Sequence, residues 1–268
     1  MKKYLLLLLS ITTISFNVKA QEESPYKTNL KVDLPLTVGG VGLSGLGVYF
    51  ISQKESLSEA EVNSLRKTDV NSFDRFSAGY NSESAKNLSD LPFYASFVAP
   101  LTLLLDDGVY QNAPQVFLLY GETMAITGTL FAMTAGLVDR YRPLAYGLDT
   151  PADQRSSKNA RNAFFAGHVA ATSSATFFFA KVFNDFNPDS PARPYVWGAA
   201  AAIPVAVGYM RIKAGKHFLS DVITGYAVGT TVGILVPHLH KKTNLSGFSA
   251  TPTYDRIEGK GVALAYTF

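Results

Sequence analysis

Residues 211–237 read RIKAGKHFLSDVITGYAVGTTVGILVP, a short charged segment followed by a long apolar run. The run shows no alternation of apolar and polar residues, and it carries Gly225, Gly229 and Gly233 at intervals of four. Residues four apart lie on one face of a helix, so the glycines predict a ridge on which a neighbouring helix packs closely. The stretch therefore predicts an apolar helix with charged side chains gathered at its start.

Apolar runs of this kind recur along the chain and predict its fold class. They are too long for strands and rich in Ala, Leu, Gly and Thr, which favours helices. The runs are Leu34–Ile51, Phe93–Leu105, Val116–Val138, Ala163–Phe183, Tyr195–Met210 and Val222–Pro237. The sequence thus predicts an all-α fold, a bundle of about six apolar helices.

The lengths of these runs leave the relation to a membrane open. Only the third and fourth runs reach the roughly 20 residues that cross a bilayer comfortably. A compact membrane bundle with short helices and a periplasmic helical domain that leans on the membrane both fit this pattern.

Residues 1–20 have the pattern of a secretory signal peptide. Lys2 and Lys3 precede an apolar run, and Val18-Lys19-Ala20 has the pattern of a cleavage site. Removing this segment takes away three lysines and no acid, which cancels the formal charge of +3. The balanced charge gives no reason to expect a nucleic-acid partner. The chain has no cysteine, which excludes disulfides and a cysteine nucleophile.

The remaining segments complete a plan of four parts. We expect a signal peptide (1–20), an N-terminal helix with a polar insertion (21–92), a helical core (93–240) and a tail (241–268). The tail alternates apolar and polar residues near its end, which predicts one strand or an extended clip.

The polar insertion runs from Ser52 to Leu91. Its sequence Ser58-Glu-Ala-Glu61 is a capping box, which predicts a surface helix. The apolar residues of that helix would include Val62, Leu65, Val70 and Phe73. We interpret the insertion as a solvated helical hairpin, with a lid over a site as the alternative.

The pattern that most strongly indicates a catalytic site is His217 followed four residues later by Asp221. On a helix the two share a face, so the carboxylate can accept a hydrogen bond from one ring nitrogen while the other nitrogen faces a substrate. Arg211 lies six residues before His217. The pattern predicts a histidine nucleophile held by a carboxylate.

Two further segments bring histidine or arginine to the end of an apolar run. Gly167-His168 begins the fourth run, where backbone N–H groups at a helix start favour an anion and His168 can supply a proton. Arg140 and Arg142 follow the third run, and guanidinium groups bind phosphate oxygens in a bidentate manner. Together the three segments predict a phosphate site.

These residues resemble the signature of the type 2 phosphatidic acid phosphatases and vanadium haloperoxidases. That signature is a Lys separated by six residues from Arg-Pro, then Pro-Ser-Gly-His, then Ser-Arg with a His after five residues and an Asp after three more. Arg142-Pro143, Gly167-His168 and Arg211 with His217 and Asp221 match it with the same spacing. The resemblance spans roughly residues 93–238.

The resemblance implies a fold and a set of roles. It implies a helical bundle of the acid phosphatase and haloperoxidase type, in which His217 attacks phosphorus and Asp221 holds its imidazole. Arg142, Arg211, Gly167 and Arg140 would bind the phosphate, and His168 would protonate the leaving oxygen. Neither a metal nor another cofactor is implied.

The chain departs from the signature at four positions. The family lysine falls on Ala135, the proline and serine of the second part fall on Phe165 and Ala166, and the serine of the third part falls on Met210. We expect Arg140, Lys213 or Lys216 to replace the lost contacts. The alternatives are a catalytically weakened or non-catalytic lipid-phosphate-binding envelope protein, and a vanadate-dependent haloperoxidase.

The expected activity is a phosphatase acting on a phosphomonoester or diphosphate. A phosphorylated lipid suits apolar helices around an anion site, and a small phosphate ester is the other candidate. We expect an exported protein in the cell envelope, membrane-associated or integral, with its site facing the periplasm. His238-Leu-His240 has a spacing that can bind metal, but we interpret it as a solvated helix end.

Overall fold

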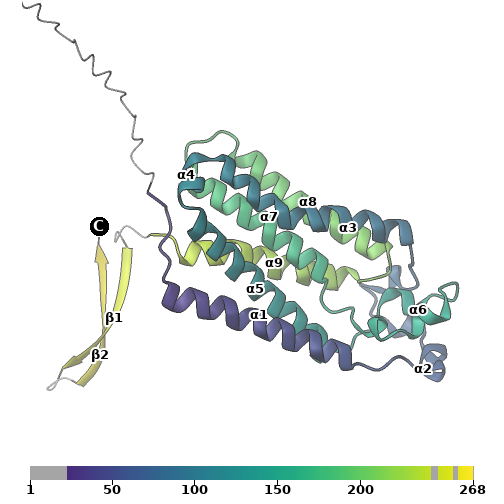
Figure 1. Cartoon of the computed structure of the whole chain (residues 1–268). Coiled ribbons are helices and arrows are strands. Elements are labelled where there is room, and N and C mark those ends of the chain that lie inside the picture. The colour runs from purple at the N-terminus through teal and green to yellow at the C-terminus, as the bar shows by residue number, and fades with distance from the viewer. Residues whose placement is uncertain (1–22, 243–246, 256–258, 268) are drawn as a thin grey trace, which may run out of the picture.

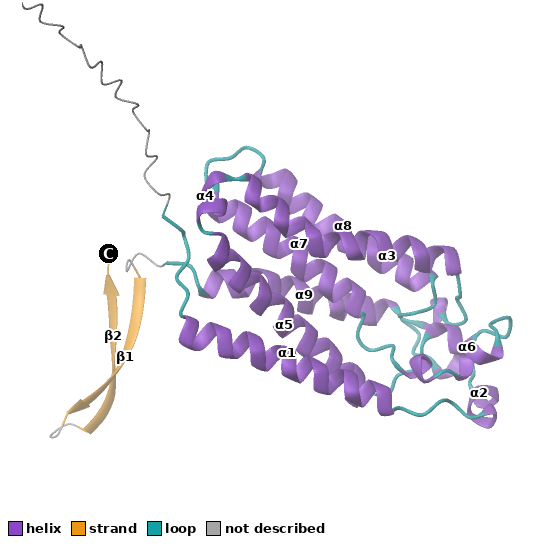
Figure 2. Ribbon diagram, viewed as in Figure 1, coloured by secondary structure: helices purple, strands orange, loops and turns teal. Residues whose placement is uncertain are grey.

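The computed structural model describes residues 23–242, 247–255 and 259–267. The proposed signal peptide, residues 1–20, lies outside the described residues. All six apolar runs are helical, as predicted: α1 (Leu30–Gln53), α3 (Glu83–Val98) with the 3-10 helix η3 (Ala99–Leu105), α5 (Ala113–Leu137), α7 (Gly167–Phe186), α8 (Arg193–Lys213) and α9 (Leu219–Leu239). The predicted all-α bundle is confirmed, and Figure 2 shows how completely helices make up its body.

Short helices connect the long ones. They are α2 (Glu59–Ser64), η1 (Lys67–Asp69), η2 (Arg75–Ser77), α4 (Asp107–Gln111), η4 (Pro143–Tyr146), α6 (Ala152–Ser156) and η5 (Lys158–Arg161). The helices α2 and α6 lie together at one end of the bundle, and the segment from residue 23 to α1 lies at the other end (Figure 1).

The helix α7 forms the centre of the bundle. It contacts α3, α5, α8 and α9, and its buried residues run along most of its length. The predicted glycine ridge of α9 packs against it: a Cβ added at Gly225 would lie 2.5 Å from the carbonyl oxygen of Ala166, and one added at Gly229 would lie 2.1 Å from that of Ala170. Only glycine lets the two backbones come this close.

In the part of the chain that the structure describes, five helical stretches are long and apolar enough to cross a membrane. They are Leu30–Gln53, Glu83–Leu105, Ala113–Leu137, Arg193–Lys213 and Leu219–Leu239. The prediction that only the third and fourth runs reach this length is wrong, because the other helices extend past their apolar runs into polar flanks. The fourth run, α7, is not among these candidate spans.

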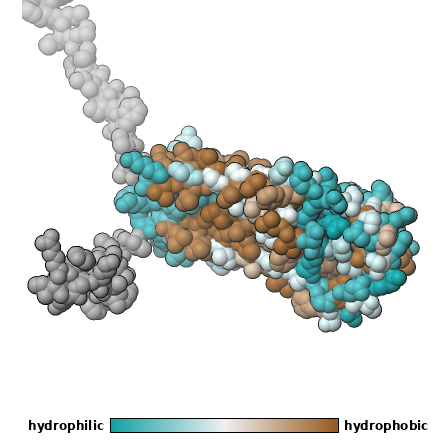
Figure 3. Space-filling model, turned by 90° about the horizontal axis from the view of Figure 1, so that it is seen from below, coloured by the Kyte–Doolittle hydropathy of each residue, from teal (hydrophilic) through white to brown (hydrophobic). Residues whose placement is uncertain are grey.

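The surface has the distribution expected of an integral membrane protein. A broad apolar band lies between two polar ends on the face shown in Figure 3. On α1 the exposed residues include Leu34, Val38, Val41 and Val48. Exposed leucine and valine side chains over this length are stable against lipid rather than water. The chain is therefore integral, and the prediction of a domain that only leans on the membrane is discarded.

Two predictions about the flanking segments need correction. The capping box at Ser58 is present, but α2 ends at Ser64, and Val70 and Phe73 lie beyond it in a series of turns and 3-10 helices. The tail forms two strands rather than one: β1 (Gly247–Asp255) pairs in antiparallel register with β2 (Gly259–Thr267).

The proposed four-part division stays a prediction. The boundary at residue 92 falls within α3, which continues through it, and α1 packs along α5 of the proposed core.

Candidate active site

The three charged segments predicted from the sequence meet at the end of the bundle that carries α2 and α6. Arg142, Gly167, His168, Arg211 and His217 line one cavity of about 560 Å³. Its other walls are side chains of α1, α3, α5 and α7, among them Val41, Phe93, Met124, Phe131 and Ala171. The cavity therefore joins two imidazoles and two guanidinium groups to a largely apolar space between helices.

Backbone pairing fixes the segment that carries Arg142. The N–H of Arg142 donates to the carbonyl of Ala160 (2.7 Å), and the N–H of Ala163 donates to that of Arg140 (3.0 Å). The Arg142 Nε also donates to the carbonyl of Asn162 (3.3 Å). These bonds join the residues after α5 to the residues that lead into α7. Arg142 and His168 are therefore carried by two segments that pair through their backbones. Burial and the charge of Arg211 lower the pKa of Arg142 to about 10.

His168 is the second residue of α7 and is held on two sides. Its ring stacks on that of Phe93, with centroids 4.0 Å apart and planes 24° from parallel. Its Nε2 lies 3.3 Å from Oδ1 of Asp90. Asp90 also lies 3.6 Å from a terminal nitrogen of Arg211, which donates to the hydroxyl of Ser89 (3.3 Å). The middle of α3 thus positions both a histidine and an arginine of the cavity.

His217 lies in the loop between α8 and α9 rather than on the helix. Its side chain is buried, and its Nδ1 lies 2.6 Å from the carbonyl oxygen of Ala163. A carbonyl accepts hydrogen bonds only, so Nδ1 carries the proton and Nε2 keeps its lone pair. Burial lowers the pKa of His217 well below its usual value, and the charges of Arg142 and Arg211 lower it further. The ring is therefore neutral at pH 7.

The expected contact between Asp221 and the imidazole is absent, and this prediction is corrected. One oxygen of Asp221 accepts from the N–H of Phe218 (2.8 Å), and the other accepts from Arg140. His217 precedes the first turn of α9, so the helical spacing of four residues does not apply to it. The carbonyl of Ala163 takes the place that was predicted for the carboxylate.

Arg140 is also engaged elsewhere. It pairs with both Asp74 (2.7 Å) and Asp221, donates to Ser220 (3.0 Å), and lies over the ring of Phe218 at 5.0 Å. It is not among the residues that line the cavity. Its expected role as a phosphate ligand is therefore replaced by a structural one.

Asp74 and Asp90 are site-forming residues that the sequence analysis missed. Asp74 is fully buried and accepts from the N–H and the hydroxyl of Ser220 (2.9 and 2.6 Å). Its pKa is lowered by these bonds and by hydrogen bonds from Asn71 and Arg140, against the opposing effect of burial. Both aspartates belong to a polar, acid-rich insertion, where no spacing distinguishes them from solvated neighbours. The insertion is anchored to the start of α9.

A second, polar hollow meets the cavity at its charged end. Its volume is about 550 Å³, and Arg142, His168 and Arg211 line both spaces. Lys86 and Lys216 also line the polar hollow. Burial lowers the pKa of Lys216 to about 8, with a further contribution from Arg142 and Arg211. Lys213, by contrast, lies over the rings of Tyr80 and Tyr209.

Residues 116–245 match the family model described as the PAP2 superfamily. The chain belongs to the PAP2 superfamily. Members of this superfamily are typically phosphatases, and the match includes every residue of the signature that this chain retains.

Among solved structures, the chain is similar to the "first transmembrane PAP2 type phosphatidylglycerolphosphate phosphatase from Bacillus subtilis". The two are 18% identical, with a TM-score of 0.44, over 77% of this chain and 94% of that one. No curated protein gave a significant match.

Proposed function

We propose that this PAP2 protein hydrolyses a phosphomonoester or diphosphate carried on a lipid, through a phosphohistidine on His217. The observation that carries the proposal is the single cavity that Arg142, His168, Arg211 and His217 line together. A phosphoryl group in that cavity meets a neutral imidazole, a second imidazole and two guanidinium charges. Phosphoryl transfer depends mainly on such positioning and charge stabilisation.

The reaction proceeds in two displacements at phosphorus. In the first, Nε2 of His217 bonds to phosphorus, the bond from phosphorus to the leaving oxygen breaks, and His168, in its protonated form, gives that oxygen a proton and becomes neutral. In the second, water attacks phosphorus while His168 takes its proton, and the P–N bond to His217 breaks to release phosphate. Arg142 and Arg211 neutralise the oxygens of phosphorus in both steps.

Lys216 supports the activity of a chain that lacks the signature lysine at Ala135. Of the three residues expected to compensate, Arg140 is paired with two buried carboxylates and Lys213 lies on aromatic rings. Lys216 lines the polar hollow beside Arg142 and Arg211. We assign it the missing positive charge.

The apolar walls of the cavity favour a lipid over a soluble ester. Val41, Phe97, Met124 and Phe131 come from helices whose outer faces are apolar. An acyl or prenyl chain can pass from the bilayer into this space without exposure to water. A soluble monoester would contact only the charged end.

Phosphate release by the purified protein in detergent tests the proposal. The substrates are phosphatidate, a polyprenyl diphosphate and p-nitrophenyl phosphate, compared between the wild type, His217→Ala and a matched control, His238→Ala. His238 is an exposed histidine near the other end of α9. We expect release by the wild type and the control, with the lipids preferred, and none by His217→Ala. Equal release by all three proteins would refute the role of His217.

We propose further that the site faces the periplasm. The segment that precedes α1 lies at the end of the bundle opposite α2 and α6 (Figure 1), and residues of α6 line the polar hollow beside the site. A periplasmic site therefore places residues 23–29 on the cytoplasmic side, which is incompatible with cleavage of a signal peptide just before them. The predicted cleavage of a signal peptide after residue 20 and the predicted periplasmic site are thus alternatives. Of the two, we retain the periplasmic site.

The absence of cysteine makes this topology directly testable. Asn63→Cys on α2 and Lys27→Cys before α1 place single thiols at the two ends, both at exposed positions. A membrane-impermeant maleimide applied to spheroplasts should label Asn63→Cys, and it should label Lys27→Cys only after lysis. The reverse pattern would place the site in the cytoplasm.

A further inference from the structure

At the end of the bundle opposite the phosphate site, three potential metal ligands face one another. Asp33 of α1, Glu122 of α5 and His240 after α9 each offer one atom, and these atoms lie within 4.8 Å of one another. Both carboxylate residues are more than nine-tenths buried, at 4% and 5% exposure. His240, which was expected at a solvated helix end, has a side chain only 15% exposed.

The surroundings orient each of the three groups toward a common point. Nδ1 of His240 lies 2.8 Å from the carbonyl oxygen of Val236 and donates to it, so Nε2 is the ring nitrogen that faces the carboxylates. One oxygen of Asp33 accepts from the N–H of Asn29 (2.6 Å), and the other lies 3.4 Å from Nε2 of His240. Hydrogen bonds on the outer atoms of ligands are typical of metal sites.

Glu122 supplies the observation that points to a missing partner. Its Oε2 is buried without a hydrogen bond, and it lies 3.6 Å from Nε2 of His240. Among the described residues, no lysine or arginine forms an ion pair with Asp33 or Glu122. Two facing carboxylates, one with an oxygen that lacks a hydrogen bond, and the imidazole of His240 beside them leave room for a cation as the missing partner.

The distances fit a small divalent ion. Zinc binds histidine nitrogen and carboxylate oxygen at about 2.0–2.2 Å, so two ligands of a tetrahedral site lie about 3.3–3.5 Å apart. The separations from Nε2 of His240 to Asp33 and to Glu122 are 3.4 and 3.6 Å. We propose that Asp33, Glu122 and His240 bind one divalent metal ion, for which Zn²⁺ is the best match.

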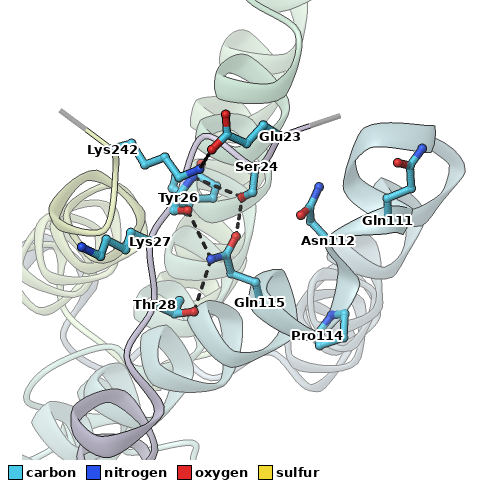
Figure 4. Close-up of a pocket in the computed structure, with 10 residues that line it drawn as sticks. All are labelled: Glu23, Ser24, Tyr26, Lys27, Thr28, Gln111, Asn112, Pro114, Gln115 and Lys242. Carbon is cyan, nitrogen blue, oxygen red and sulfur yellow. Dashed lines mark hydrogen bonds and ion pairs between the residues drawn. The ribbon is translucent and has the colours of Figure 1, made fainter. Parts of the chain in front are cut away.

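The segment that closes this end of the bundle holds the ligands in place. The N–H of Lys27 donates to the carbonyl of His240 (2.7 Å), so the segment before α1 is joined to the end of α9. The amide of Gln115, on α5, donates to the carbonyl of Tyr26 and the hydroxyl of Thr28, both at 3.2 Å. Figure 4 shows the contacts of Gln115 beside a hollow of about 600 Å³. A bound ion would tie together the same three elements, α1, α5 and α9.

Zinc binding by the full chain in detergent tests the proposal, independently of phosphatase activity. After EDTA treatment and removal of the chelator, the wild type should bind one Zn²⁺ per chain in equilibrium dialysis. Its melting temperature should rise by about 5 °C or more at a hundredfold excess of Zn²⁺ over the Kd. Mg²⁺, which prefers six oxygen ligands, should give no comparable shift.

Three variants separate this site from adventitious binding. Glu122→Gln and His240→Ala should lose the bound zinc and the shift, whereas His238→Ala, an exposed histidine two residues away, should retain both. Glu122→Gln keeps the size of the side chain and removes one of two repelling carboxylates, so it should fold. Equal shifts in all four proteins, or no bound zinc in the wild type, would overturn the proposal.

Discussion

Replacing Asp221 by Asn distinguishes two possible roles of this carboxylate. It could orient the imidazole of His217, or it could stabilise the fold by accepting from Phe218 and Arg140. If the carboxylate oriented the imidazole of His217, the amide would favour the wrong tautomer, and kcat would fall by roughly 10⁴. In the structure the carbonyl of Ala163 fixes that tautomer instead, from 2.6 Å. We therefore expect Asp221→Asn to lower kcat by less than about tenfold.

The same substitution should cost stability. Asp221 is fully buried and accepts from Phe218 and from Arg140, whose side chain is 25% exposed. Asparagine has a single oxygen, so it keeps one of these contacts and loses the other. Hydrogen bonds to charged groups contribute about 1.5–3 kcal/mol. Since Arg140 keeps Asp74 and some contact with water, we expect a loss of about 1–3 kcal/mol.

Asp74→Asn is the matched control for this experiment. It weakens the other partner of Arg140 without approaching the imidazole. Both variants should lower the melting temperature in detergent by similar amounts, and both should retain most of the wild-type rate of phosphate release. A thousandfold loss of kcat in Asp221→Asn alone would refute our assignment and restore the contact with His217.

Three further predictions follow from the site and its packing. Lys216→Gln should lower kcat by tenfold to a hundredfold, while Lys213→Gln should not. Because the pKa of Lys216 is about 8, the wild-type rate should fall above pH 8 as this lysine loses its charge. The fall should be missing from Lys216→Gln. The folded-state pKa of His217 lies well below the unfolded value near 6.5, so the contribution of this histidine to stability is complete above pH 6.5. Acidification below pH 6.5 removes that contribution by up to about 1.4 kcal/mol per pH unit. Melting temperatures measured from pH 4.5 to 7.5 should therefore fall more steeply on acidification in the wild type than in His217→Gln. Gly229→Ala should destabilise the bundle by at least about 1–3 kcal/mol, because its Cβ would lie 2.1 Å from a carbonyl of α7, whereas Gly198→Ala, with no atom within 4 Å of the added Cβ, should leave the melting temperature unchanged or raise it.

Local composition was enough to predict the helices and their closest packing. Each apolar run is helical, and Gly225 and Gly229 face the backbone of α7 because a period of four residues determines one helix face. The segments that carry Arg142, His168, Arg211 and His217 were also identified, since charge is costly in apolar helices and stands out against them. What these residues do in a reaction remains our proposal.

The remaining features depend on contacts that sequence spacing does not encode. Asp221 was assigned to His217 because a helix was assumed to include both, but α9 begins at Leu219. Asp74 and Asp90 belong to the polar insertion, which is distant in sequence from the signature segments. From the sequence alone, any acidic residue of the insertion was an equally good candidate for a contact with the site. Likewise, Glu122 could not be paired with Asp33 before the packing of α1 on α5 was known.

Main-chain contacts join the two segments that carry His168 and His217. The N–H of Ala166 donates to the carbonyl of Asp221 (3.0 Å), which joins the start of α7 to the start of α9. Gly225 maintains this approach one turn further on, since a Cβ there would strike the carbonyl of Ala166. His168 lies two residues after Ala166 in the first segment, and His217 lies four residues before Asp221 in the second. Substitutions in the signature at Phe165 and Ala166 leave the junction intact, because it uses only main-chain atoms, and the geometry of the site therefore survives the loss of two signature side chains.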